Sequence, residues 1–285
     1  MKYTCSSRRL AVLLHTAALI AVFSATPSFA ITFDDGTSHT NTADVTYNEN
    51  LYIGYFNPDN TLVVTSNSTI QAESVTLGNR ETSTNNLLDI TGGSLVMAGT
   101  SDTNGLSTGG LVVGRTDGEA ALHINHGSTV DTDYLYVGYG TNDSGQADLS
   151  GEDSELYVSS DAYIGLGGSN NVLTIDQGAE LVVEGMLQVG SDISTNNSLL
   201  VKNGSVFVNT TNDINVVNAD DDDEIRIYQN GTLKIGGNVD TGSIDDLGVT
   251  MDSKASLAVG GELTLEKNRI GAVDSKQRLC PKGAC

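Results

Sequence analysis

A unit of 24–27 residues is repeated along most of this chain, and the repeat restricts the possible folds more than any other feature. Its clearest copy, from Ala162 to Gly190, reads AYIG LGGSNN VLTI DQGAE LVV EGM LQVG. This copy contains three short runs of alternating apolar residues, separated by turns rich in Gly, Asn, Ser and Asp. Such runs, returning at a fixed period, are typical of a solenoid built from short β-strands.

The residue that ends the first run of each unit is a marker for the period. The motif (apolar)-x-(apolar)-Gly ends at Gly54, Gly78, Gly114, Gly138, Gly165 and Gly190, with weaker copies at Val217, Gly242 and Glu266. Successive marker positions are 24, 36, 24, 27, 25, 27, 25 and 24 residues apart. The single long step indicates a 12-residue insertion, which we place in the segment TSDTNGLSTGG.

Two further series of residues keep the same period. Three residues after the last apolar position of the middle run stand Asn67, Gly93, Gly127, Glu152, Gly178, Gly204 and Asn230. All but Glu152 are Gly or Asn, which tolerate a left-handed backbone with positive φ, so we predict a corner at this point of every coil. Just before the middle run stand Asn60, Asn86, Asn171 and Asn197, which would form an amide ladder if the coils stack.

These series predict an all-β protein, folded as a right-handed parallel β-helix (β-solenoid) of about nine to ten coils with 24–27 residues per coil. The repeats would occupy residues 51–266. Residues 31–50 lack the marker glycine and would form an N-terminal capping coil, because an uncovered solenoid end exposes unpaired backbone groups. The chain has no Trp and no helical-period apolar stretch after residue 30, so we expect no separate helical or catalytic domain.

The first 30 residues have the pattern of a secretory signal peptide. Three positive residues precede an apolar run from Leu10 to Phe23, and a small-x-small site follows at residues 28–30. The apolar run is too short to span a membrane as a helix, so we expect no transmembrane segment in the mature chain.

The last residues, 267–285, lose the repeat and are predicted to form an irregular basic tail. The tail contains Cys280 and Cys285. In an oxidising compartment these two residues could form a local disulfide; the alternative is a disordered tail with two free thiols.

Charge and residue usage exclude several functions. The formal net charge is −22, and removal of residues 1–30 takes it to −25, so we expect no nucleic acid as a partner. Only His39, His123 and His126 follow the signal peptide, and no G-x-S-x-G or Ser-x-x-Lys motif occurs. We therefore assign no catalytic residue, no cofactor and no metal, and do not expect an enzyme. The alternative is a carbohydrate-active β-helix enzyme, a polysaccharide lyase or hydrolase, which would need carboxylates clustered in one groove.

Three weaker candidates for chemistry have simpler explanations. The acidic run 220–224 could bind calcium, but such runs are more often solvated loops. His123 and His126 fit a surface pair better than a shared metal site. The outward positions of the first run hold Tyr52, Tyr136 and Tyr163, for which a stabilising cross-strand ladder is favoured over a sugar-binding face.

The unit L-x-V-G followed by N-x-L-x-I-x-x-G-(A/S)-x-L-x-V resembles the repeat of autotransporter (type V secretion) passenger domains. It is also similar to repeats of bacterial surface proteins with a Pro-Glu-Pro C-terminal sorting signal (PEP-CTERM). The resemblance covers residues 51–266 and implies a rod that displays repetitive polar rows in a structural or adhesin-like role. It implies secretion, or display at the cell surface or outer membrane of a Gram-negative-type bacterium, with the periplasm as the alternative. Glycans or surface proteins of a host or of the envelope are the expected partners.

Overall fold

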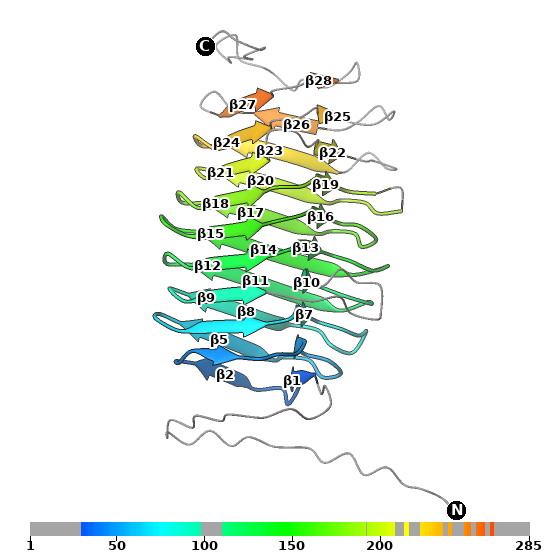
Figure 1. Ribbon diagram of the computed structural model, residues 1–285. Helices are drawn as coiled ribbons and strands as arrows, with labels where there is room; N and C mark the ends of the chain where they lie inside the picture. The colour runs from blue at the N-terminus through cyan, green and yellow to red at the C-terminus, as the bar shows by residue number, and fades with distance from the viewer. Residues whose placement is uncertain are drawn as a thin grey trace, which may run out of the picture.

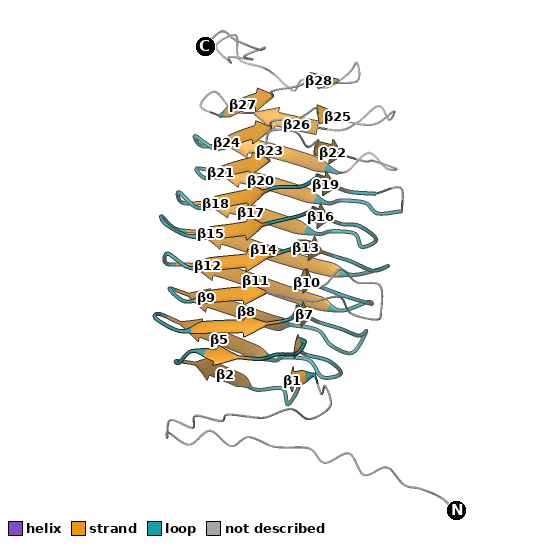
Figure 2. Cartoon of the chain, in the orientation of Figure 1, coloured by secondary structure: helices purple, strands orange, loops and turns teal. Residues whose placement is uncertain are grey.

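The chain is an all-β solenoid in which parallel strands stack turn upon turn. The computed structural model describes residues 30–97, 110–191, 193–208, 214–216, 223–235, 239–240, 248–251, 255–259 and 263–264. In these residues every named strand pairs in parallel with its neighbours, and no helix occurs. Each turn gives one strand to each of three sheets, so that the turns form a rod (Figure 1, Figure 2).

Three sheets run along the rod. The first contains β1 (Ile31–Phe33), β4 (Leu51–Ile53), β7 (Val75–Leu77), β10 (Gly110–Val113), β13 (Tyr134–Val137), β16 (Ala162–Ile164), β19 (Leu187–Val189), β22 (Ile214–Val216), β25 (Val239–Asp240) and β28 (Leu263–Thr264). The second contains β2 (Ser38–Asn41), β5 (Thr61–Thr65), β8 (Asn86–Thr91), β11 (Glu119–Asn125), β14 (Ser144–Ser150), β17 (Val172–Asp176), β20 (Ser198–Lys202), β23 (Glu224–Tyr228) and β26 (Gly248–Met251). The third contains β3 (Val45–Thr46), β6 (Thr69–Ala72), β9 (Ser94–Met97), β12 (Thr129–Thr132), β15 (Glu155–Val158), β18 (Glu180–Val183), β21 (Ser205–Val208), β24 (Thr232–Ile235) and β27 (Ser256–Val259).

The solenoid has about seven turns, which run from β1 to β21. Our expectation of nine to ten coils is therefore slightly too high. That expectation counted coils at the weak markers Val217, Gly242 and Glu266, which lie outside the described residues. Beyond β21 the description is interrupted, and the described residues add β22 to β28 to the ends of the three sheets.

Alternate residues of each strand point inward and build one continuous apolar core. On β17, for example, Leu173 and Ile175 are fully buried while the residues beside them are half-buried. The register places Leu173 between Ala147 of the previous turn and Leu199 of the next. Burying a Leu or Ile side chain contributes roughly 1.5–3 kcal/mol, so the apolar rows hold successive turns together.

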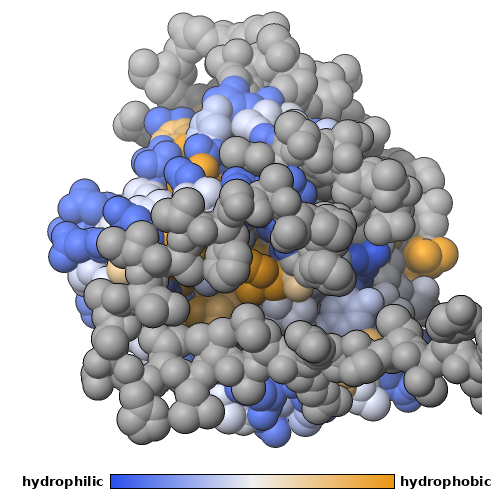
Figure 3. All heavy atoms as spheres, turned by 60° about the horizontal axis from the view of Figure 1, so that its bottom comes forward, coloured by the Kyte–Doolittle hydropathy of each residue, from blue (hydrophilic) through white to orange (hydrophobic). Residues whose placement is uncertain are grey.

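The first turn departs from this pattern at its inward positions. His39 and Asn41 pair in register with the core residues Leu62 and Val64 of the next turn. Figure 3 brings this end of the rod forward and shows apolar residues there beside polar ones. Polar inward residues thus lie on β2, where they disfavour pairing of the free edge with another chain, whereas Ile31 and Phe33 of β1 still pack against the apolar core.

Most of the predicted corner glycines have a left-handed backbone. Their φ values lie between 63° and 88°. Gly93 and Gly204 also lie in the turns between the second and third sheets, but the left-handed residue there is one position earlier, Gly92 (φ 68°) and Asn203 (φ 51°). Close packing explains these two glycines instead: a Cβ on Gly93 would lie 2.7 Å from a backbone oxygen, and one on Gly204 2.8 Å from a core side chain. The left-handed glycines are Gly54, Gly78, Gly114, Gly138, Gly165, Gly190, Gly127 and Gly178.

Several sequence-based expectations lie outside the described residues. They concern the signal peptide up to residue 29, the predicted insertion TSDTNGLSTGG except for its last residue, Gly110, which begins β10, residues 220–222 of the acidic run, and the tail with Cys280 and Cys285.

Candidate binding surface

The connections from the first sheet to the second line one edge of the rod. They contain five to eight residues between β4 and β20, whereas the connections from the second sheet to the third have two to four. The longer loops project at the right of Figure 1. Side chains that belong to no sheet therefore gather along this edge.

A buried asparagine ladder anchors these loops. We give this name to Asn60, Asn86, Asn171 and Asn197, each fully buried at the start of the second sheet. Asn60 Nδ2 donates to Asn86 Oδ1 at 2.9 Å, and Asn171 Nδ2 donates to Asn197 Oδ1 at the same distance. The last member, Asn197, donates to Asp223 Oδ1 at 3.0 Å. The ladder predicted from the repeat therefore exists, in two separate segments.

Each marker glycine beneath the ladder makes room for an asparagine of the next turn. A Cβ built on Gly54 would lie 2.1 Å from Asn86 Oδ1, and one on Gly165 would lie 2.1 Å from Asn197 Cγ. The asparagine side chain therefore occupies the space that a side chain at the glycine position would need. The marker glycine is required for this contact as well as for its positive φ.

Between the two ladder segments, a buried aspartate takes the place of a ladder asparagine. Asp143 is fully buried, and its carboxylate accepts hydrogen bonds from the backbone N–H groups of Gly140 and Asp117. Burial raises the pKa of Asp143, although these backbone hydrogen bonds oppose the shift. This carboxylate holds together the loops that follow β10 and β13.

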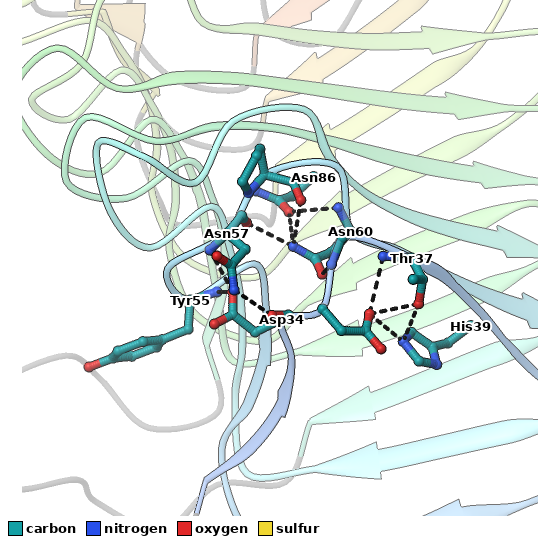
Figure 4. A network of polar contacts seen from close by, with 10 residues as sticks. Asp34, Thr37, His39, Tyr55, Asn57, Asn60 and Asn86 are labelled. Atoms are coloured by element: carbon teal, nitrogen blue, oxygen red, sulfur yellow. Dashed lines mark hydrogen bonds and ion pairs between the residues drawn. The ribbon is translucent and has the colours of Figure 1, made fainter. Parts of the chain in front are cut away.

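A second aspartate fixes the loop after β4. Asp34 Oδ1 accepts three successive backbone N–H groups, from Tyr55 (3.0 Å), Phe56 (2.8 Å) and Asn57 (2.7 Å). Figure 4 shows this loop curled around the carboxylate while the Tyr55 ring points away from the network. Three N–H groups aimed at one anion define the backbone conformation, so the aromatic side chains of the loop are presented in a fixed direction.

Aromatic and cationic side chains occur on these anchored loops in consecutive turns. The edge strip, as we call it, consists of Tyr55, Phe56, Arg80, Arg115 and Tyr139. It crosses four consecutive turns, which are joined by backbone hydrogen bonds to the carbonyl oxygens of the marker glycines. At the spacing of neighbouring strands, four turns span roughly 14 Å.

Each arginine of the edge strip lies over an aromatic ring. Arg80 Cζ is 5.2 Å from the ring centroid of Tyr55 and 4.8 Å from that of Phe56, and Arg115 Cζ is 5.9 Å from that of Tyr139. Such cation–π contacts orient the planar guanidinium groups without neutralising them. The Phe56 side chain is 52% exposed, so the strip is open to solvent at this end.

The charge distribution singles out the same strip. Arg80 and Arg115 are the only Lys or Arg residues between positions 31 and 201. Neither forms an ion pair in the part of the chain that the structure describes, whereas Lys202 and Arg226 pair with Asp176 and Glu224. In a chain of net charge −22, two guanidinium groups are thus kept without a carboxylate partner.

The tyrosines singled out in the sequence lie beside this strip. Tyr136 and Tyr163 stack at a centroid distance of 5.2 Å and an interplanar angle of 5°, which is the expected cross-strand ladder. Tyr136 is only 6% exposed, so its ring face is not available to a ligand. Edge-to-face contacts join Tyr52 to Tyr55 and the ladder residue Tyr136 to Tyr139, so a tyrosine of the first sheet supports each end of the edge strip.

The Tyr163 phenol offers a direct test of this packing. Burial and the neighbouring Asp161, to which Tyr163 donates at 3.2 Å, raise the pKa of Tyr163 to about 12. We expect the difference between the alkaline absorbance titrations of the wild type and Tyr163→Phe to show one phenol ionising near that pH. Since the folded-state pKa lies above the ordinary value near 10, the associated stability is complete below about pH 10 and is lost as the pH rises towards 12. Asp161→Asn should lower this pKa; an unchanged titration would contradict the assignment.

The two histidines singled out in the sequence have different neighbours. His123 points outward from β11, with Nε2 3.7 Å from Asp148 Oδ2, whereas His126 lies in the following turn and contacts Asn125. Among the described residues, no group of three His, Cys, Asp or Glu side chains could hold a metal ion.

Sequence reasoning missed the edge strip. Tyr55 and Arg80 stand one and two residues after successive marker glycines, and Arg115 and Tyr139 each follow the next two markers directly. Aligning the repeats on these glycines would have brought Tyr55, Arg115 and Tyr139 into one row, with Arg80 displaced by one position. The role of Asp34 had no such indication, because the first turn lacks the marker.

Comparisons with protein-family models, curated proteins and solved structures give no match to this chain. The described residues contain no helix of the length and apolar character needed to cross a membrane.

Proposed function

We propose that this chain is an exported β-solenoid of the cell envelope, which acts as an adhesin-like or passenger-like rod and binds a partner through its edge strip. The observation that carries the proposal is the strip itself: one exposed ring, two half-buried tyrosine rings, and two arginines without a carboxylate partner among the described residues, on anchored loops of an acidic rod. Preformed, solvent-exposed aromatic and arginine side chains are enriched in binding interfaces. The signal-peptide pattern of residues 1–30 supports export, and the repeat supports a surface or outer-membrane location.

Export and binding can be tested in a Gram-negative host that produces the full chain. We expect the protein in the medium or on the surface, accessible to added protease, with Ile31 as its first residue. Leu13→Arg is the control, because a charge in the apolar run should keep the chain inside the cell. An intact N-terminus and a purely cytoplasmic location for the wild type would overturn the proposal, as would failure of the exported chain to bind cells, glycans or surface proteins.

One observation favours the second candidate, a carbohydrate-active β-helix enzyme. The outward row of the second sheet contains Asp89, His123 and Asp148 in register on three consecutive strands. Carboxylates beside an imidazole can act as general acid and base. If the chain is a lyase or hydrolase, it should release new sugar ends from a polysaccharide, and His123→Ala should abolish that release. Full release by His123→Ala would remove this row from consideration.

A further inference from the structure

We infer that the edge strip binds an acidic saccharide chain of the uronic-acid type, whose carboxylates meet Arg80 and Arg115 while its sugar rings lie against the aromatic side chains. This inference rests on the proposed binding function and names the chemical class of its ligand.

The arginines define the charge of the ligand. A guanidinium group presents a planar fork of N–H donors that matches a carboxylate with two parallel hydrogen bonds. Two other basic side chains of the rod, Lys202 and Arg226, have acidic partners, whereas Lys234 lies 4.8 Å from the ring centroid of Phe207. Arg80 and Arg115 are directed onto rings, and Arg80 Nη2 also donates a hydrogen bond to Tyr55 Oη at 3.4 Å. The guanidinium N–H groups of both arginines can consequently donate hydrogen bonds to an external anion.

The rings at both ends of the strip define the shape of the ligand. Pyranose rings have an apolar face of C–H groups and a polar rim, which suits aromatic side chains with a polar tip such as Tyr55 and Tyr139. Phe56 extends the aromatic surface into solvent. Along the strip, aromatic side chains lie at both ends and the two arginines lie between them. A ligand that contacts all of these side chains needs sugar rings for the aromatic positions and carboxylates for the arginines.

The arrangement across turns favours an extended ligand. Backbone N–H groups of Asn79, Arg115 and Tyr139 donate to the marker glycine of the preceding turn at 3.0, 2.8 and 3.2 Å. The row therefore runs along the rod at the strand spacing, roughly 5 Å per turn. A linear oligosaccharide laid along the rod would contact all four turns, so that several weak contacts add up in one molecule.

The strip is also organised before the ligand arrives. The Asp34 carboxylate holds the Tyr55 loop through three backbone hydrogen bonds. Edge-to-face contacts with Tyr52 and Tyr136 fix the two terminal tyrosine rings. Fewer side chains must therefore be immobilised on binding, which raises affinity for a given set of contacts.

The test is calorimetric titration of the purified full chain with an unbranched hexamer of galacturonic acid and with its neutral methyl ester. We expect the acidic hexamer to bind at least about tenfold more tightly than the ester, because only the free carboxylates can pair with the arginines. Arg80→Gln combined with Arg115→Gln should weaken binding of the acidic hexamer by about the same factor. The matched control is Arg226→Gln, which removes a paired cation on the second sheet and should leave binding unchanged.

Three further measurements separate the outcomes. Circular dichroism melting shows whether the double variant keeps its fold, and the lysine pair Arg80→Lys and Arg115→Lys, which keeps the charge but not the fork, should bind with intermediate affinity. Equal affinity for acid and ester, equal weakening by Arg226→Gln, or preferential binding of single-stranded DNA would overturn the inference. If the exported chain binds cells and excess acidic hexamer does not compete, the inference fails while the proposed function stands. If the chain binds the hexamer but never leaves the cytoplasm, the inferred ligand stands while the proposed export fails.

Discussion

Gly165→Ala is expected to destabilise the rod by about 3–4 kcal/mol, one of the two largest effects that we predict for a single substitution. Gly165 has a φ of 77°, and an added Cβ would lie 2.1 Å from Asn197 Cγ. The asparagine cannot move aside cheaply, because its side chain is fully buried and bonded to both neighbouring turns. Urea unfolding followed by circular dichroism measures the loss.

Gly127→Ala is the matched control for this prediction. Its φ of 72° carries a similar backbone strain, but the nearest atom to an added Cβ is 3.8 Å away, at ordinary contact distance. We therefore expect a loss of only about 1 kcal/mol. Combining Gly165→Ala with Asn197→Ala should cost less than the sum of the two single changes, because the second removes the clash created by the first. Equal losses for the two glycine variants would show that φ alone, and not the asparagine contact, requires glycine.

Asn171→Asp should have the second large effect, about 3 kcal/mol of destabilisation at neutral pH. Asn171 accepts the Gly145 N–H through Oδ1 and donates through Nδ2 to Asn197 Oδ1. A carboxylate keeps the first hydrogen bond but places an anionic oxygen against the Asn197 oxygen in a buried site. Burial without a cation should also raise the pKa of the new carboxyl group above its ordinary value.

The sign of the pH dependence follows from that raised pKa. A protonated carboxyl group can donate to Asn197 Oδ1, so the deficit relative to the wild type should be small near pH 4 and grow as the pH rises to 7. The control is Asn170→Asp, which adds the same charge at the neighbouring exposed residue, whose φ of 62° an aspartate tolerates. It should change stability by less than about 0.5 kcal/mol. A loss for Asn171→Asp that does not depend on pH would contradict the proposed donor role.

The periodic part of the fold could be predicted from the sequence because period and burial have one physical cause. Residues such as Leu173 and Ile175 alternate along a strand, and stacking repeats them in every turn, so one correct unit predicts the others. The asparagine ladder followed for the same reason. Spacing alone could not distinguish a glycine required for positive φ from one required for close packing, as Gly93 and Gly204 show.

The binding surface was harder to predict because it depends on contacts between turns at positions outside the repeat pattern. Arg80 is the second residue after its marker glycine, whereas Tyr55 is the first residue after its own. The two side chains come into contact although they hold different positions in the repeat. Asp34 comes from a turn without any marker and acts across to the next turn. Each of these contacts occurs once and does not recur from turn to turn, so the repeat period cannot predict it.

The connection between β9 and β10 shows how this architecture accommodates extra sequence. Residues 98–109 are inserted there, yet Leu111 and Val113 still pair with Val75 and Leu77 of the preceding turn. A corner that already accepts a dozen additional residues without loss of register is a natural place for a grafted epitope or a fused enzyme. Cargo joined at that corner would be carried at a fixed height on the rod, which makes the protein a candidate scaffold for engineered display.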